Sequence, residues 1–255
     1  QLDRQTLTYG AHDRQAVEYF APGNPESVKP PLIAFIHGGA WMAGDRMRAI
    51  HHKARHFTGK GYAFASIGYR VLPDAPVEEQ ARDIANGLTQ LRKEASALGF
   101  DADRIVLMGH SAGAHLAALV STDPSYLGDT MSAIEGVVLL DGAGYDVTAR
   151  LAPRRGRASR VYAKVFGDDP VRHASLSPVT HAGSPDVNNW LILHVADRRQ
   201  SSMQSTMLRD ALVKAGSKAQ TVAVPDSNHS QLNRNLGLID DFATQQVDAF
   251  LEALF

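Results

Sequence analysis

The chain has 255 residues, of which 44% are hydrophobic and 21% charged, with no cysteine. These values are ordinary for a soluble globular domain and exclude collagen, coiled coil and wholesale disorder. The net charge of -1 argues against a nucleic-acid backbone as the main partner. Without cysteine there are no disulfides, thiol nucleophiles or thiolate metal sites.

No stretch approaches the roughly 20 apolar residues needed to span a bilayer, so no membrane span is expected. The sequence begins at Gln1 rather than Met. This start fits a processed or trimmed chain, and the compartment stays open between the cytoplasm and export after signal removal.

Short apolar runs bounded by turns recur along the chain and are typical of buried strands. The first two runs precede any helical pattern, and we expect them to form an antiparallel hairpin at the edge of the sheet. The expected strands cover residues 16–20, 32–37, 63–69, 105–109, 137–141, 191–196 and 221–224.

Helical periodicity appears between these runs, most clearly over residues 77–98, where apolar residues recur at steps of three and four. Residues 112–122, 203–215 and 239–254 show similar spacing. Alternating strands and helices predict an α/β fold with a mostly parallel central sheet and helices on both faces. We expect one domain over residues 1–255.

Residues 142–189 interrupt this rhythm, with several prolines and no strong strand. A long irregular segment inside a compact domain is usually functional or disordered. We interpret it as a small cap-like insertion over the sheet. Five of its arginines form a basic patch, for which a solvated face is the leading interpretation and attraction of an anionic substrate the alternative: Arg150, Arg154, Arg155, Arg157 and Arg160.

The segment Gly109-His110-Ser111-Ala112-Gly113 carries the clearest chemical signal. It joins an expected strand directly to an expected helix. The two glycines suit a tight turn that lifts the Ser111 hydroxyl clear of the sheet, as in a nucleophile elbow. Ser111 is therefore the candidate nucleophile.

A serine nucleophile needs a base, and the base needs an acid that orients it. The expected chain order is serine, acid, histidine. Asp197 follows the strand at 191–196, and His229 lies in the loop after the strand at 221–224. We predict Asp197 as the acid and His229 as the base.

Other residues could fill these roles less well. Asp226 lies in the same loop as His229 and is badly placed to brace its ring from behind, whereas Asp168 and Asp169 lie in the insertion. His194 lies within a predicted strand and is interpreted as structural.

The segment His37-Gly38-Gly39-Ala40-Trp41 directly follows a predicted strand. Glycines let the main chain approach a substrate, and fixed backbone N–H groups stabilise a developing oxyanion. We expect the N–H groups of Gly39, Ala40 and Ala112 to form the oxyanion hole. Trp41 could line a substrate pocket together with His110, or it could be a core residue.

The HGGAW and GHSAG segments, with Asp197 and His229 in order, resemble serine esterases of the α/β-hydrolase fold over nearly the whole chain. They resemble in particular the branch of feruloyl-esterase-like carboxylesterases and arylformamidases. One departure is Ala40, which replaces the third glycine of the HGGG form.

The resemblance implies a serine carboxylesterase with the triad Ser111, Asp197 and His229 and a small-molecule ester substrate, without metal or cofactor. An arylformamidase using the same residues is the alternative. A non-catalytic ligand-binding protein on this fold is an alternative of another class. The oligomeric state and the natural substrate stay open.

Overall fold

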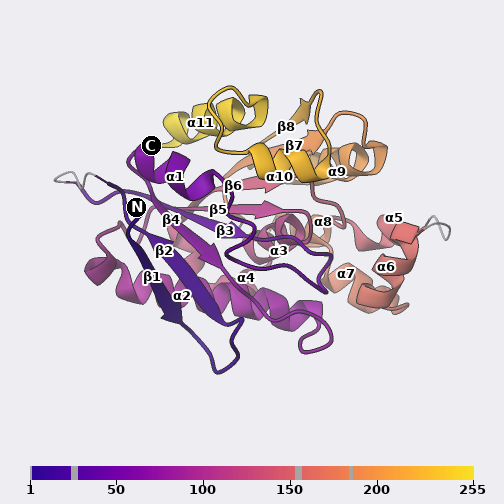
Figure 1. The fold of residues 1–255 in the computed structure, drawn as a ribbon. Coiled ribbons are helices and arrows are strands. Elements are labelled where there is room, and N and C mark those ends of the chain that lie inside the picture. Colours follow the sequence, from indigo (N-terminus) through magenta and orange to yellow (C-terminus); the bar gives the residue numbers. More distant parts are fainter. Residues whose placement is uncertain (1, 24–27, 153–156, 184–185) are drawn as a thin grey trace.

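The computed structural model describes residues 2–23, 28–152, 157–183 and 186–255. Within these residues, eight strands form one sheet in the order β1-β2-β4-β3-β5-β6-β7-β8 (Figure 1). The strands are β1 Arg4–Thr8, β2 Ala16–Phe20, β3 Leu32–Ile36, β4 Ala63–Ile67, β5 Ile105–His110, β6 Ile134–Leu140, β7 Asn189–Val195 and β8 Lys218–Val224.

Strands β3 to β8 run parallel to one another, so the sheet is mostly parallel, as predicted. The prediction that the strands at 16–20 and 32–37 pair as an edge hairpin is wrong. Strand β2 pairs antiparallel with β1 and with β4, while β3 lies in the interior of the sheet between β4 and β5. The mostly exposed strand β1 lacks a continuous apolar run, so its sequence gave no strong strand signal.

Helices cover both faces of the sheet, as predicted. Helices α2 and α3 pack on one face, and α1 and α11 pack on the other (Figure 1). The described helices are α1 Lys53–Gly59, α2 Val77–Leu98, α3 Ala112–Thr122, α4 Pro124–Leu127, the 3₁₀ helix η1 Gly128–Ala133, α5 Val147–Leu151, α6 Arg157–Phe166, α7 Pro170–Ser175, α8 Pro178–His181, α9 Arg199–Ala215, α10 His229–Asn235 and α11 Phe242–Leu254.

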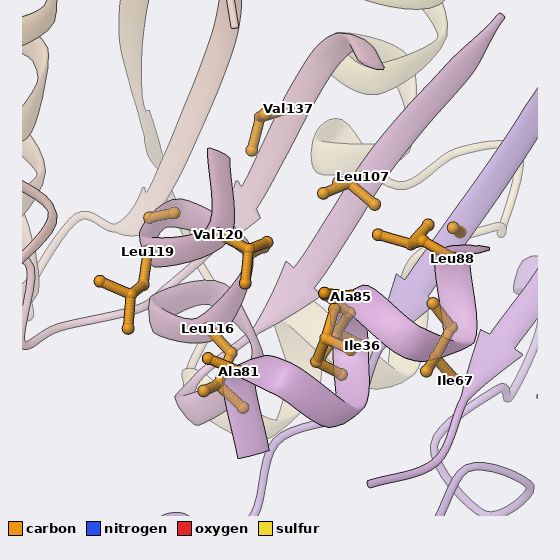
Figure 2. Close-up of a cluster of buried hydrophobic side chains, with 14 of the residues drawn as sticks. Ile36, Ile67, Ala81, Ala85, Leu88, Leu107, Leu116, Leu119, Val120 and Val137 are labelled. Atoms are coloured by element: carbon orange, nitrogen blue, oxygen red, sulfur yellow. The ribbon is translucent and has the colours of Figure 1, made fainter. Parts of the chain in front are cut away.

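The core beneath α2 and α3 holds the two helices rigidly on the strands (Figure 2). Ala81, Ala85 and Leu88 recur at helical spacing on the buried side of α2. Burying a side chain of the size of leucine contributes about 2 kcal/mol. The sheet and α3 contribute the facing residues Ile36, Ile67, Leu107, Leu116, Leu119, Val120 and Val137.

The segment 142–189 forms the short helices α5 to α8, and its described residues before the start of β7 contain no strand. Its arginines do not form one solvated face. Arg150 is buried and lies over the ring of Tyr162, with its guanidinium carbon 4.2 Å from the ring centroid, whereas Arg160 is exposed. Arg154 and Arg155 lie outside the described residues.

Among the described residues, none of the helices combines the length and the apolar character required to cross a membrane.

Candidate active site

Ser111 stands at the turn between β5 and α3, as the sequence predicts. Its backbone has φ 56° and ψ −118°, a conformation that L-residues rarely adopt. The flanking glycines make this turn possible. A Cβ on Gly109 would lie 2.3 Å from the carbonyl oxygen of Gly113, and a Cβ on Gly113 would lie 2.2 Å from that of Ile36.

His229 is the first residue of α10, and the structure places it beside Ser111. Its Nε2 lies 2.9 Å from Ser111 Oγ. The helix start is fixed by a capping box, in which Asn228 accepts from the N–H of Gln231 and the Gln231 side chain accepts from the N–H of Asn228. The imidazole is therefore held on a defined helix start.

The carboxylate beside His229 Nδ1 is that of Asp141, and the structure does not bring the predicted acid, Asp197, to this position. Asp141 directly follows β6, and its Oδ2 lies 2.7 Å from His229 Nδ1. Its backbone has φ 47°, which turns the chain sharply at the end of the strand. Its other oxygen, Oδ1, accepts from the N–H of Val195 at 3.1 Å.

Asp197 lies just past the end of β7, where the chain turns. The N–H of Ala196 donates to the carbonyl of Val224, and the N–H of Arg198 donates back to Val195. This tight turn leaves Asp197 exposed to solvent. Another candidate, Asp169, accepts from the N–H of Val171 and so caps α7.

The Asp141 carboxylate is fully shielded from solvent, yet it stays charged. Burial alone would raise its pKa, but hydrogen bonds from His229 and Ser201 and the charge of Arg198 outweigh this effect. They hold the pKa of the Asp141 carboxyl well below its usual range. The Arg198 guanidinium contacts both Asp141 Oδ2 and His229 Nδ1, and sequence reasoning did not single out this residue.

The HGGAW loop crosses directly over the nucleophile. A Cβ on Gly38 would lie 2.9 Å from Ser111 Cβ, so only glycine allows this approach. Gly39 and Ala40 both have positive φ, of 134° and 53°. Within the described ranges, neither of their N–H groups has a hydrogen-bond acceptor in the protein. Among the described residues, the two residues after Gly38, which itself lies against Ser111, therefore carry N–H groups without an acceptor.

Trp41 is only 2% exposed, which favours the core-residue alternative. Its indole N–H donates to His115 Nδ1 at 3.2 Å, and its ring packs edge-on against Tyr162 and Phe166 of α6. Trp41 is therefore a core residue that joins the loop to the segment 142–189.

His110 is buried, and one of its faces lines a pocket beside the HGGAW loop. Its Nε2 contacts the carbonyl oxygen of His229 at 2.9 Å. Burial, and next the charge of a protonated His229, lower the pKa of His110 to about 3. His110 is therefore neutral near pH 7 and donates this hydrogen bond, which positions the backbone of the base.

No cluster of three metal-ligating side chains occurs in the part of the chain that the structure describes. His52 precedes α1 and His56 lies in its last turn, where His56 Nε2 pairs with Asp248 Oδ1 at 2.8 Å. His194, interpreted as structural, is buried in β7.

The strand order, the serine on its strained turn and the histidine after the last strand together define an α/β-hydrolase fold. Residues 19–212 match the model of the BD-FAE family. The chain belongs to that family.

Similar proteins agree with this assignment. The chain is 26% identical to isoprenylcysteine alpha-carbonyl methylesterase of Arabidopsis thaliana over 247 residues, covering 90% of this chain and 57% of the relative. It is 26% identical to kynurenine formamidase of Danio rerio over 234 residues, covering 90% of this chain and 75% of the relative. The chain spans about half the length of the plant methylesterases that it matches.

Among solved structures, the chain resembles esterase B from Lactobacillus rhamnosis, with a TM-score of 0.80 and 22% identity over 99% of this chain and 85% of that one. At this identity the likeness concerns the fold.

Proposed function

We propose that this chain hydrolyses carboxylic esters of small to medium size through an acyl-enzyme on Ser111. The observation that carries the proposal is the continuous chain of contacts from Ser111 Oγ to His229 Nε2 and from His229 Nδ1 to Asp141 Oδ2. The esterase names among its relatives support ester substrates.

In the proposed reaction, His229 Nε2 takes the Ser111 proton while Oγ attacks the ester carbonyl carbon. Asp141 keeps the remaining ring proton on Nδ1 and stabilises the positive imidazolium. The protonated His229 then gives its proton to the leaving alcohol. In the second half, water loses a proton to His229 and attacks the acyl-enzyme, which releases the acid and free Ser111.

We assign the oxyanion hole to the backbone N–H groups of Gly39, Ala40 and Ala112. The free donors of Gly39 and Ala40 beside Ser111 support this role, and Ala112 begins the helix that follows the nucleophile. Removing one such donor in a serine hydrolase typically costs about 10²–10³ in kcat. We further propose that residues 142–189 act as a small cap within a single domain 1–255.

A substrate panel and Ser111→Ala test the proposal. We expect turnover of p-nitrophenyl acetate and butyrate, and a loss of at least about 10³-fold in Ser111→Ala. Unchanged activity in this variant would refute the mechanism. No turnover by the wild-type chain of any ester or amide, with ligand binding retained, would favour a non-catalytic binding protein.

A second candidate reaction is the deformylation of an arylformamide on the same residues, favoured by the match to kynurenine formamidase. Methyl ferulate and N-formylkynurenine discriminate the two. Fast deformylation beside near-zero ester turnover would replace the esterase proposal.

A further inference from the structure

A pocket of about 660 Å³ opens beside the candidate active site. Gly38, Gly39 and His110 form its wall on the side of the nucleophile. Gly38 lies so close to Ser111 that an added Cβ would approach Ser111 Cβ to 2.9 Å. A substituent on an ester bound at Ser111 can therefore reach into this pocket.

Arg14 and Arg48 also line the pocket. Arg14 donates to the carbonyl oxygen of Gly44 at 2.7 Å. Within the described ranges, neither arginine has a carboxylate within 4.0 Å. Arginines elsewhere in the fold do: Arg46 pairs with Glu18, Arg70 with Asp83 and Arg172 with Glu78.

The remaining titratable groups of the pocket leave it with a positive balance. The Asp45 carboxylate accepts from the N–H groups of Met47 and Arg48 at 2.9 Å. Burial alone would raise the pKa of Asp45, but these hydrogen bonds outweigh it, so the group is negative. Burial lowers the pKa of His51 and of His110, so both rings are neutral near pH 7. Two positive charges therefore face one negative charge.

Guanidinium groups recognise carboxylates because their planar donors match two oxygens at once. On the basis of the proposed ester hydrolysis, we propose that this pocket binds a carboxylate of the substrate, separate from the scissile ester. Arg14 and Arg48 then determine a preference for anionic over neutral esters. The carboxylate can stand on the acyl side or on the alcohol side of the ester.

Two matched substrate pairs test this inference and distinguish the two sides. Mono-p-nitrophenyl glutarate against p-nitrophenyl valerate places the charge on the acyl side. 4-Acetoxybenzoate against 4-acetoxytoluene places it on the alcohol side. We expect the wild-type kcat/KM to favour the anionic member of one pair by about tenfold or more, equivalent to about 1.4 kcal/mol.

The variant Arg14→Gln/Arg48→Gln removes both charges, whereas Arg48→Lys keeps both charges and replaces one guanidinium by an ammonium group. We expect the double variant to lose the anionic preference while its rate on the neutral ester stays within about twofold, which also shows that it folds. Arg48→Lys retains much of the preference. The matched control is Arg55→Gln, which removes an exposed charge on α1 outside this pocket and leaves the preference intact.

A wild-type chain that treats both members of each pair alike overturns the inference, and so does an equal loss in Arg55→Gln. A loss of activity on neutral and anionic esters alike also contradicts a charge-specific role. If the wild-type chain cleaves none of the four esters, or if Ser111→Ala cleaves them equally well, the proposed function itself fails. These outcomes separate the two proposals.

Discussion

Replacing Asp141 by Asn tests which carboxylate supports the base. Asn is nearly isosteric and can still accept from the N–H of Val195, so the end of β6 keeps its packing. What changes is the group at 2.7 Å from His229 Nδ1. An amide carries no negative charge, and its NH₂ favours the tautomer with the proton on Nε2, which cannot take the Ser111 proton.

The size of the effect follows from Coulomb's law. Two unit charges 2.7 Å apart interact with about 6 kcal/mol at an effective dielectric of about 20, and with about 3 kcal/mol at about 40. At 1.36 kcal/mol per tenfold, these values correspond to a loss in rate between about 2 × 10² and about 3 × 10⁴. The positive charge of Arg198, which contacts both groups, moves the expectation toward the lower end of this range.

The assay compares kcat/KM on p-nitrophenyl butyrate for Asp141→Asn and the matched control Asp197→Asn. Because Asp197 is exposed and lies outside the contact chain, we expect its variant to stay within about twofold of wild type. Thermal unfolding of both variants excludes loss of the fold as the cause. A large loss in Asp197→Asn with little change in Asp141→Asn would refute the assignment of the acid.

Two further predictions concern stability. Gly113→Ala should lower the free energy of unfolding by about 3 kcal/mol, because the new Cβ would lie 2.2 Å from the carbonyl oxygen of Ile36. Lys53 is fully buried, and burial lowers its pKa to about 7. The unfolded chain therefore binds a proton that the folded chain lacks between about pH 7 and pH 10, and wild-type stability should rise across this window. Relative to Lys53→Met, the gain should be about 2 kcal/mol from about pH 7.5 to about pH 9.

Urea unfolding measures the free energy of unfolding in both cases. The control for Gly113→Ala is Gly59→Ala, because open space surrounds an added Cβ there and alanine favours helix. A similar loss of stability in these two variants would contradict the steric argument. For the second, a stability difference between wild type and Lys53→Met that stays constant with pH would show that Lys53 is not titrating in this window.

The sequence singled out Ser111 and His229, which lie side by side in the structure, because each has a local signal. Ser111 lies between two glycines at a strand-to-helix junction, and His229 follows the last strand. The carboxylate that contacts His229 has no such signal. Asp141 and Asp197 both stand at the end of a parallel strand, and both side chains could reach the same edge of the sheet.

What separates them is the backbone after each strand. Asp141 adopts a positive φ that aims its carboxylate at His229, whereas the turn after Val195 leaves Asp197 in solvent. Neither conformation can be deduced from residue types. The burial of Trp41 could not be predicted from the sequence either, because its partners Tyr162 and Phe166 are more than a hundred positions away in the chain.

The contact of Trp41 with α6 couples the HGGAW loop to the segment 142–189. Tyr162 and Phe166 belong to the proposed cap, and Trp41 belongs to the loop that carries the proposed oxyanion donors. A substitution in α6 is therefore expected also to shift the backbone that carries the proposed oxyanion donors. If the proposed roles hold, a change of the cap that alters substrate choice also alters turnover, and replacements at Tyr162 or Phe166 need compensating changes around Trp41.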